Sequence, residues 1–177
     1  MKIQIIACLS EMVKVKFGED KWNKILELSD MDTDDKYLQH MNGLDIHDNK
    51  AFELIQNTCI VLNVSREEAA DAFGEYWVCV YAPRVYKMYY GRYNNAKDFL
   101  MGMDFIHAEV TKNVENAHPP RFEIEELEKN KIKLKYISKR NMFDFCIGLI
   151  KGIGKYFNTN VEVVKISDNS CEITFLS

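Results

Sequence analysis

The residues with the clearest chemical potential are Tyr136, Ser138 and Arg140, which recur at every second position. Alternation from Leu134 to Arg140 predicts a strand that turns these three side chains inward and its lysines toward water. An arginine is seldom fully buried without an anionic partner. Its planar fork and the two hydroxyl groups together suit carboxylates. A simpler interpretation is a local ion pair between Arg140 and a glutamate at a solvated strand end.

His107 is the second candidate, because it lies on an apolar stripe of a helix predicted over residues 96–114. Leu100, Met103, His107 and Val110 form this stripe at helical spacing. A lone histidine in such a place is more often a core residue with a satisfied hydrogen bond. A haem would account for both features, because its iron accepts an imidazole ligand and its two propionates supply carboxylates for Arg140.

The elements that must position these residues come in the order helices, hairpin, helix, hairpin. Apolar periodicity predicts helices over residues 2–16, 20–29, 49–63, 66–80, 96–114 and 141–157. Ser65 and Glu68 have the spacing of a capping box at the start of the fourth helix. Period-two alternation around the turn at residues 128–130, and again over 160–166 and 171–176, predicts two hairpins. The class is therefore α+β with a four-stranded antiparallel sheet.

Two other stretches contain residues found in binding sites, but neither has the required spacing. The acidic segment 30–48 includes His40 and His47 without metal-ligand spacing, and such segments are usually solvated. The glycines from Gly148 onward precede Lys155, yet their spacing does not fit a phosphate-binding loop and Tyr156 replaces the expected Ser or Thr.

The composition is typical of one globular domain and disfavours several classes of function. Of 177 residues, 47% are hydrophobic and 28% are charged, and the net charge of -4 argues against nucleic acid as the main partner. No apolar run approaches the roughly 20 residues of a membrane span, so we expect no membrane partner and no signal peptide. The five dispersed cysteines contain no C-x-x-C pair, which favours reduced thiols and a cytoplasmic location.

The spacing Tyr136-x-Ser138-x-Arg140, preceded by a helical His107 and by Pro119-Pro120, resembles the haem nitric oxide/oxygen binding (H-NOX) domain. This family also provides the haem domain of soluble guanylate cyclase. The resemblance covers essentially the whole chain and includes Phe73-Gly74-Glu75-Tyr76-Trp77. It implies a bacterial stand-alone domain with a helical N-terminal subdomain at residues 1–60, a haem-ligating α/β subdomain at residues 61–177, and haem b between them.

The resemblance also implies roles for individual residues. His107 becomes the proximal iron ligand, and the propionate clamp consists of Tyr136, Ser138 and Arg140. Pro120 presses the porphyrin out of plane, and Met103 is a further haem contact. The residues lining the distal side are Ile5, Trp77, Phe145 and Leu149.

Two departures from the family pattern shape the functional expectation. Phe145 stands where oxygen-holding members have a tyrosine. Cys171 is almost alone where some bacterial members hold zinc, so we expect no zinc. The resemblance therefore predicts a sensor that binds nitric oxide and carbon monoxide at ferrous haem and signals by releasing the proximal histidine. The alternatives are an oxygen sensor and a haem-free α+β interaction module.

The chain length and the resemblance also bear on the output of the sensor. We expect no enzymatic activity, because 177 residues leave no room for a cyclase, kinase or phosphodiesterase domain. A peroxidase is disfavoured, since no distal acid–base pair is placed for it. Resemblance to bacterial members implies that the partner is a histidine kinase or a cyclic-di-GMP enzyme.

Overall fold

The computed structural model describes residues 3–31, 46–114 and 117–176. Two compact units, Met1–Ala69 and Ala70–Ser177, make up the chain. Most of the acidic segment that we interpreted as a solvated loop, including His40, lies outside the described residues. Within the described ranges, no helix is both long enough and apolar enough to cross a membrane.

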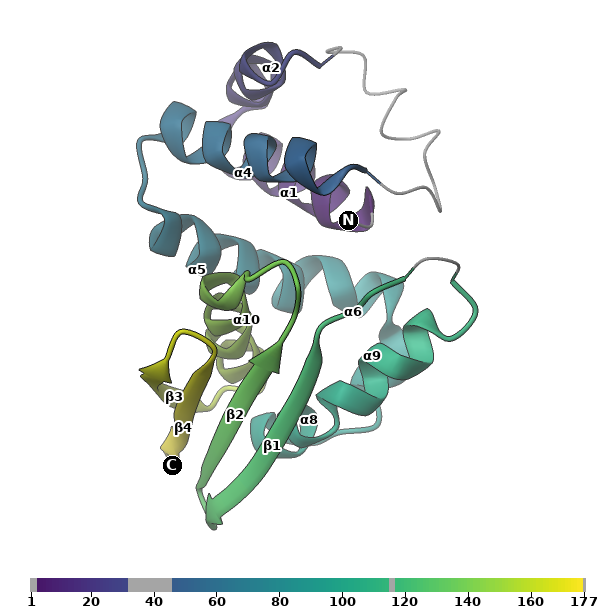
Figure 1. Ribbon diagram of the computed structural model, residues 1–177, viewed down its shortest axis with the longest axis vertical. Coiled ribbons are helices and arrows are strands. Elements are labelled where there is room, and N and C mark those ends of the chain that lie inside the picture. Colours follow the sequence, from purple (N-terminus) through teal and green to yellow (C-terminus); the bar gives the residue numbers. More distant parts are fainter. Residues whose placement is uncertain (1–2, 32–45, 115–116, 177) are drawn as a thin grey trace. The chain divides into compact units, whose positions relative to one another are not determined.

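The first unit contains the helices α1 (Ile3–Phe17), α2 (Glu19–Leu28) and α4 (Asp48–Leu62) (Figure 1). Each helix buries an apolar side, and the fully buried residues include Ile6, Val13, Trp22 and Leu54. All three helices lie within one residue of their predicted ranges. Asn63 ends α4 in the left-handed conformation, with φ of 53°, which asparagine adopts more readily than most residues.

Helix α5 (Arg66–Tyr76) begins with the predicted capping box. The backbone N–H of Glu68 donates to Ser65 Oγ at 3.1 Å, and the N–H of Ser65 donates to the Glu68 carboxylate at 2.7 Å. The chain continues through a π-helical turn, η1 (Trp77–Tyr81), into α6 (Ala82–Val85) and α7 (Lys87–Tyr90). The predicted helix over residues 66–80 is therefore helical throughout, but its last turn is wider than an α-helix.

The helix predicted over residues 96–114 is interrupted at Gly102. Helix α8 (Ala96–Met101) ends there and α9 (Met103–Thr111) begins. A Cβ on Gly102 would collide with the ring and hydroxyl of Tyr93, so only glycine allows this tyrosine to pack against the break. His107 consequently lies on a short helix of its own, α9.

The second unit contains a four-stranded antiparallel sheet in the order β1-β2-β4-β3 (Figure 1). Its strands are β1 (Arg121–Glu128), β2 (Lys131–Ile137), β3 (Asn160–Ser167) and β4 (Ser170–Leu176). The two predicted hairpins meet where β2 pairs with β4, with Leu134 opposite Cys171. On the solvent side, Lys135 and Glu123 form a cross-strand ion pair at 2.9 Å. The predicted α+β class with a helical N-terminal part is confirmed.

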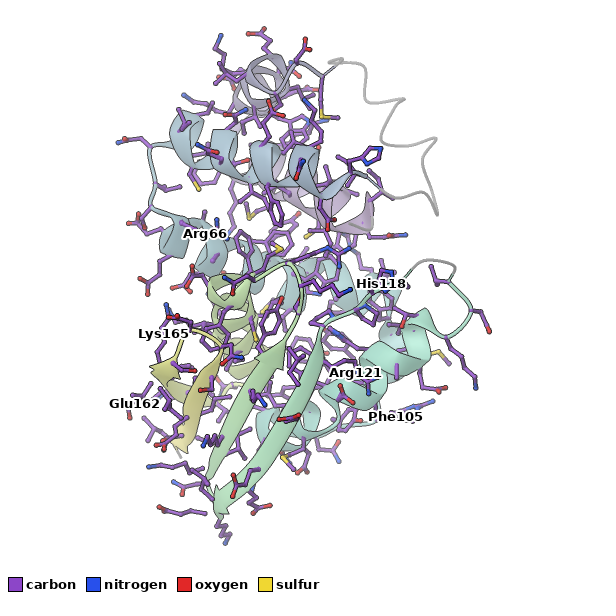
Figure 2. All side chains as sticks on the ribbon, in the orientation of Figure 1. Arg66, Phe105, His118, Arg121, Glu162 and Lys165 are labelled. Atoms are coloured by element: carbon purple, nitrogen blue, oxygen red, sulfur yellow. The ribbon has the colours of Figure 1, made fainter. Side chains whose placement is uncertain are left out.

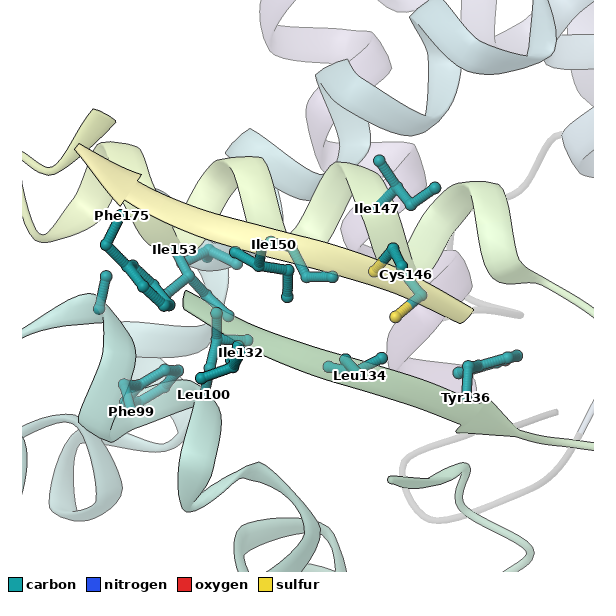
Figure 3. Close-up of a cluster of buried hydrophobic side chains, with 14 of the residues drawn as sticks. Phe99, Leu100, Ile132, Leu134, Tyr136, Cys146, Ile147, Ile150, Ile153 and Phe175 are labelled. Atoms are coloured by element: carbon teal, nitrogen blue, oxygen red, sulfur yellow. The ribbon is translucent and has the colours of Figure 1, made fainter. Parts of the chain in front are cut away.

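The core of the second unit lies between one face of the sheet and helix α10 (Phe143–Tyr156). This buried cluster joins side chains of β2, β4, α8 and α10, namely Ile132, Leu134, Tyr136, Phe175, Phe99, Leu100, Cys146, Ile150 and Ile153 (Figure 3). The alternation noted in the sequence thus places Tyr136 on the inner face of β2, with 7% of its surface exposed.

Candidate functional site

His107 lies in the middle of α9, with its imidazole facing the start of β1. Its Nδ1 atom is 3.4 Å from the carbonyl oxygen of Pro120, and its ring meets the Phe122 ring edge-on at 5.2 Å between centroids. Burial lowers the pKa of His107, although the Pro120 carbonyl and the nearby Asp104 carboxylate act in the opposite direction. A neutral imidazole that donates through Nδ1 keeps a lone pair on Nε2, which is the form that binds a metal.

Asp104, one helical turn before His107, fastens α9 to β1. Its carboxylate accepts two hydrogen bonds from Arg121, one of them from Nε at 2.7 Å, and a third from the Phe122 N–H at 2.9 Å. Hydrogen bonding from Arg121 lowers the pKa of Asp104 to about 2. Arg121 projects from the start of β1 toward α9 (Figure 2). This pair was not predicted from the sequence, in which the available signal was a carboxylate three residues before His107.

Tyr136, Ser138 and Arg140 are brought together at the end of β2. Burial raises the pKa of Tyr136, while hydrogen bonds to the Ser138 side chain and the Met142 backbone act to lower it. Ser138 Oγ accepts a hydrogen bond from the Arg140 N–H at 3.2 Å. Arg140 in turn donates from Nη1 to the carbonyl oxygen of His118 at 2.8 Å. Two hydroxyls and a guanidinium therefore occupy one end of the sheet.

The prediction that this strand extends to Arg140 is wrong, because β2 ends at Ile137. Ile137 is paired with Arg121, the first residue of β1. The residue before Arg121 is Pro120, which has no N–H to donate to a hydrogen bond between the two strands. Ser138 and Arg140 therefore lie in a turn, completed by Asn141 with a φ of 48°. The turn keeps Arg140 near Tyr136 although strict alternation has ended.

A single segment, residues 118–122, contacts both halves of this site. The His118 carbonyl accepts from Arg140, and the Pro120 carbonyl faces His107. In the described residues, no group of three or more His, Cys, Asp or Glu side chains is arranged to hold a metal ion. A single imidazole suits a metal whose other ligands come from a macrocycle, and a guanidinium with two hydroxyls suits the carboxylates of such a macrocycle. The donor set therefore fits a haem.

The structure places the other predicted contacts as follows. Phe145, in the first turn of α10, is buried and meets the Phe73 ring edge-on at 5.7 Å, and Phe73 stacks on Trp77 at 5.8 Å. Leu149, one turn further along α10, and Met103, the first residue of α9, are partly buried against the core of the second unit. Ile5 is a partly buried residue of α1 in the first unit. Phe73, which joins two predicted contacts, was not itself predicted.

Comparison with known proteins identifies relatives of this chain. The family model described as Haem-NO-binding matches residues 4–165. The soluble guanylate cyclase gcy-34 of Caenorhabditis elegans is 24% identical over 168 residues, and the match covers 88% of this chain but only 23% of that protein. This chain therefore corresponds to a minor part of that relative.

Solved structures share the fold over the full length of the chain. An H-NOX protein from S. oneidensis aligns with a TM-score of 0.88 and 23% identity, covering 100% of this chain and 97% of the other. An oxygen-binding H-NOX domain related to soluble guanylate cyclases, solved as its oxygen complex, aligns with a TM-score of 0.83 and 22% identity, covering 100% and 96%.

Proposed function

The chain belongs to the haem-NO-binding family, the H-NOX gas-sensor domains related to soluble guanylate cyclase, and from this premise we propose that it senses nitric oxide at ferrous haem b and signals by releasing His107. The contact between His107 Nδ1 and the Pro120 carbonyl carries the proposal. It supports a neutral imidazole whose Nε2 is available to iron.

Haem would supply an iron, which binds diatomic gases, and it would also bring two propionate groups. His107 would hold the iron through Nε2. Tyr136, Ser138 and Arg140 would hold the propionates, because they present hydroxyl and guanidinium donors at one end of the sheet. The remaining contacts in the proposal are Pro120, Met103, Ile5, Trp77, Phe145 and Leu149.

Release of His107 is the event that we propose as the signal. Haem would supply the iron to which nitric oxide binds, and His107 would be the residue that is freed when the gas is bound. Helix α9 would then still be tied to β1 by the bonds that Asp104 accepts from Arg121 and from the Phe122 N–H. A helix with one tether made and broken by the ligand provides the two states that a sensor requires.

The proposal gives this domain a sensor role and assigns the output to a partner protein. Resemblance to bacterial H-NOX proteins supports a histidine kinase or a cyclic-di-GMP enzyme as that partner. Nitric oxide is favoured over oxygen because Phe145 has no hydrogen-bond donor to offer a bound ligand.

The test is to purify the protein from haem-replete cells and to record its spectrum before and after nitric oxide is added to the reduced form. We expect a Soret band that shifts to the position of a nitrosyl haem without a histidine ligand. A colourless protein would contradict haem binding altogether. A band that shows histidine still bound after nitric oxide is added would contradict the release of His107.

A further inference from the structure

Helices α5 and α10 approach each other unusually closely in the second unit, and glycines form the contact. A Cβ placed on Gly74 or Gly148 would lie closer than 3.0 Å to backbone atoms of the opposite helix, and one on Gly152 would lie 2.5 Å from the Gly74 carbonyl oxygen. Ala70 stands opposite Gly148, and Gly74 stands opposite Gly152. The backbones therefore touch directly, with no side chain between them.

Two ion pairs lie beside this crossing and have the same four-residue spacing along both helices as the glycine contacts. Lys151 lies 2.6 Å from Asp71, and Lys155 lies 2.8 Å from Glu75. Each pair joins α5 to α10 one helical turn apart, so both helices run in the same direction along the contact. The pairs are partly exposed and individually weak. The separation of the helices is therefore set by the glycines, and the ion pairs oppose sliding.

The crossing adjoins the side chains that we assign to the distal side of the haem. Gly74 follows Phe73, precedes Trp77 by three residues, and packs against the backbone N of Leu149. On α10, Gly148 lies between Phe145 and Leu149. The Phe73 and Phe145 rings meet edge-on across the two helices at 5.7 Å. Any change in the spacing of the backbones must therefore change the spacing of Trp77, Phe145 and Leu149.

We propose that the glycine crossing of α5 and α10 is a positioning element. It holds Trp77, Phe145 and Leu149, the distal wall, close together and so restricts which ligands reach the iron. The proposal rests on the haem-binding function proposed above. Gly74, Gly148 and Gly152 act through the wall residues and touch no ligand themselves. A methyl group at the crossing would separate the helices, because protein backbones cannot interpenetrate, and the wall would open.

The experiment compares Gly148→Ala and Gly152→Ala with wild type and with Gly91→Ala. Gly91 is the matched control, because a Cβ there would meet its nearest neighbour, the Lys87 carbonyl oxygen, at an ordinary 3.8 Å. The affinities of the reduced proteins for carbon monoxide and for the bulkier n-butyl isocyanide are measured. The unfolding midpoint of each haem-free protein is recorded alongside.

For Gly148→Ala and Gly152→Ala we expect the ratio of the isocyanide affinity to the carbon monoxide affinity to rise on the order of tenfold. This is the size of effect seen when an apolar pocket gains room for a methylene group. Gly91→Ala should leave the ratio unchanged. A lower unfolding midpoint with an unchanged ratio would overturn the proposal, because the crossing would then serve stability alone.

A variant that keeps all the glycines guards against misfolding. Lys151→Gln combined with Lys155→Gln removes the flanking ion pairs, and Lys135→Gln, which breaks the pair with Glu123 on the sheet, is its control. We expect a smaller rise in the same ratio for the double variant only. An unchanged affinity ratio in the haem-loaded double variant would overturn the role of the ion pairs. Absence of a Soret band in the wild type would overturn the proposed function as well.

Discussion

The Nδ1 atom of His107 lies 3.4 Å from the carbonyl oxygen of Pro120, the residue directly before β1. Histidines that bind metals commonly donate their other N–H to a carbonyl or carboxylate, which fixes the tautomer and the ring orientation. Here the acceptor belongs to a proline, whose fixed φ limits the movement of its own carbonyl. His107 is therefore oriented by a rigid part of the chain and not by a flexible side chain.

Removal of the His107 imidazole should abolish stable haem binding or make binding depend on added imidazole. The reason is that this side chain supplies the proposed protein bond to iron. His107→Gly also lowers the helix propensity of α9. Ala108→Gly lowers it by at least as much, about 1 kcal/mol, without loss of the imidazole, so it serves as the control. Absorbance per protein in the Soret region is the measurement, and full haem content with an unchanged spectrum in His107→Gly would exclude this ligand.

Loss of Arg140 should reduce haem retention more than loss of Ser138. Arg140 would make a charge-assisted contact with a propionate, which is about twice as strong as the neutral hydrogen bond from Ser138. The rate of haem transfer to an excess of apomyoglobin compares Arg140→Ala with Ser138→Ala. Lys139→Ala, at the exposed position between them, should transfer haem at the wild-type rate. Equal rates in all three variants would rule out the clamp.

Much of the fold was predictable because its signals are local. The capping box at Ser65 depends on residues three apart, and the alternation that buries Tyr136 extends over neighbouring positions. The end of β2 at Ile137 was not predicted, because it depends on Pro120, which directly precedes the partner strand β1. The break at Gly102 likewise depends on Tyr93, which packs where a Cβ would be.

The candidate site shows the same division between local and distant causes. The spacing of Tyr136, Ser138 and Arg140 was visible in the sequence, whereas the contacts of residues 118–122 with α9 and with Arg140 depend on the folded chain. Gly148 and Gly152 of α10, which fit no phosphate loop, are instead explained by the closeness of α5. Periodicity gives the buried side of a helix but does not indicate how near its neighbour comes.

The bond between Asp104 and Arg121 should make stability depend on acid pH. Hydrogen bonding from Arg121 lowers the pKa of Asp104 to about 2 in the folded protein. A folded pKa below the unfolded one means that this contribution is fully present above about pH 4 and is lost as the pH falls toward 2. Asp104→Asn should therefore lower the unfolding midpoint of the haem-free protein equally at pH 7 and pH 5, and less at pH 3.

The control for this measurement is Asp168→Asn, in the exposed turn between β3 and β4. It should leave the midpoint close to that of wild type at each pH. If Asp104→Asn lowers the unfolding midpoint as much at pH 3 as at pH 7, the charge of the carboxylate does not contribute to stability through Arg121.

The reduced protein should bind carbon monoxide and nitric oxide but retain no oxygen. Oxygen bound to ferrous iron takes up negative charge and is stabilised by a distal hydrogen-bond donor. Phe145 has none, and its ring is buried against Phe73. Trp77 stacks between Phe73 and Tyr81, at 5.8 and 5.3 Å, which favours a role as an apolar wall. Spectra of the reduced protein exposed to air test this, and a long-lived oxygen spectrum would refute the selectivity for nitric oxide.

The converse substitution, Phe145→Tyr, should raise the oxygen affinity by adding a hydroxyl donor at this position. Phe143→Tyr is the matched control, because Phe143 begins the same helix but its ring packs on that of Tyr136, at 6.0 Å between centroids, whereas Phe145 packs on Phe73. Oxygen dissociation rates after rapid mixing distinguish the two variants: we expect slower dissociation for Phe145→Tyr alone. If both variants lose oxygen as fast as wild type, the hydroxyl at residue 145 does not reach the ligand, and the assignment of Phe145 to the distal side is wrong.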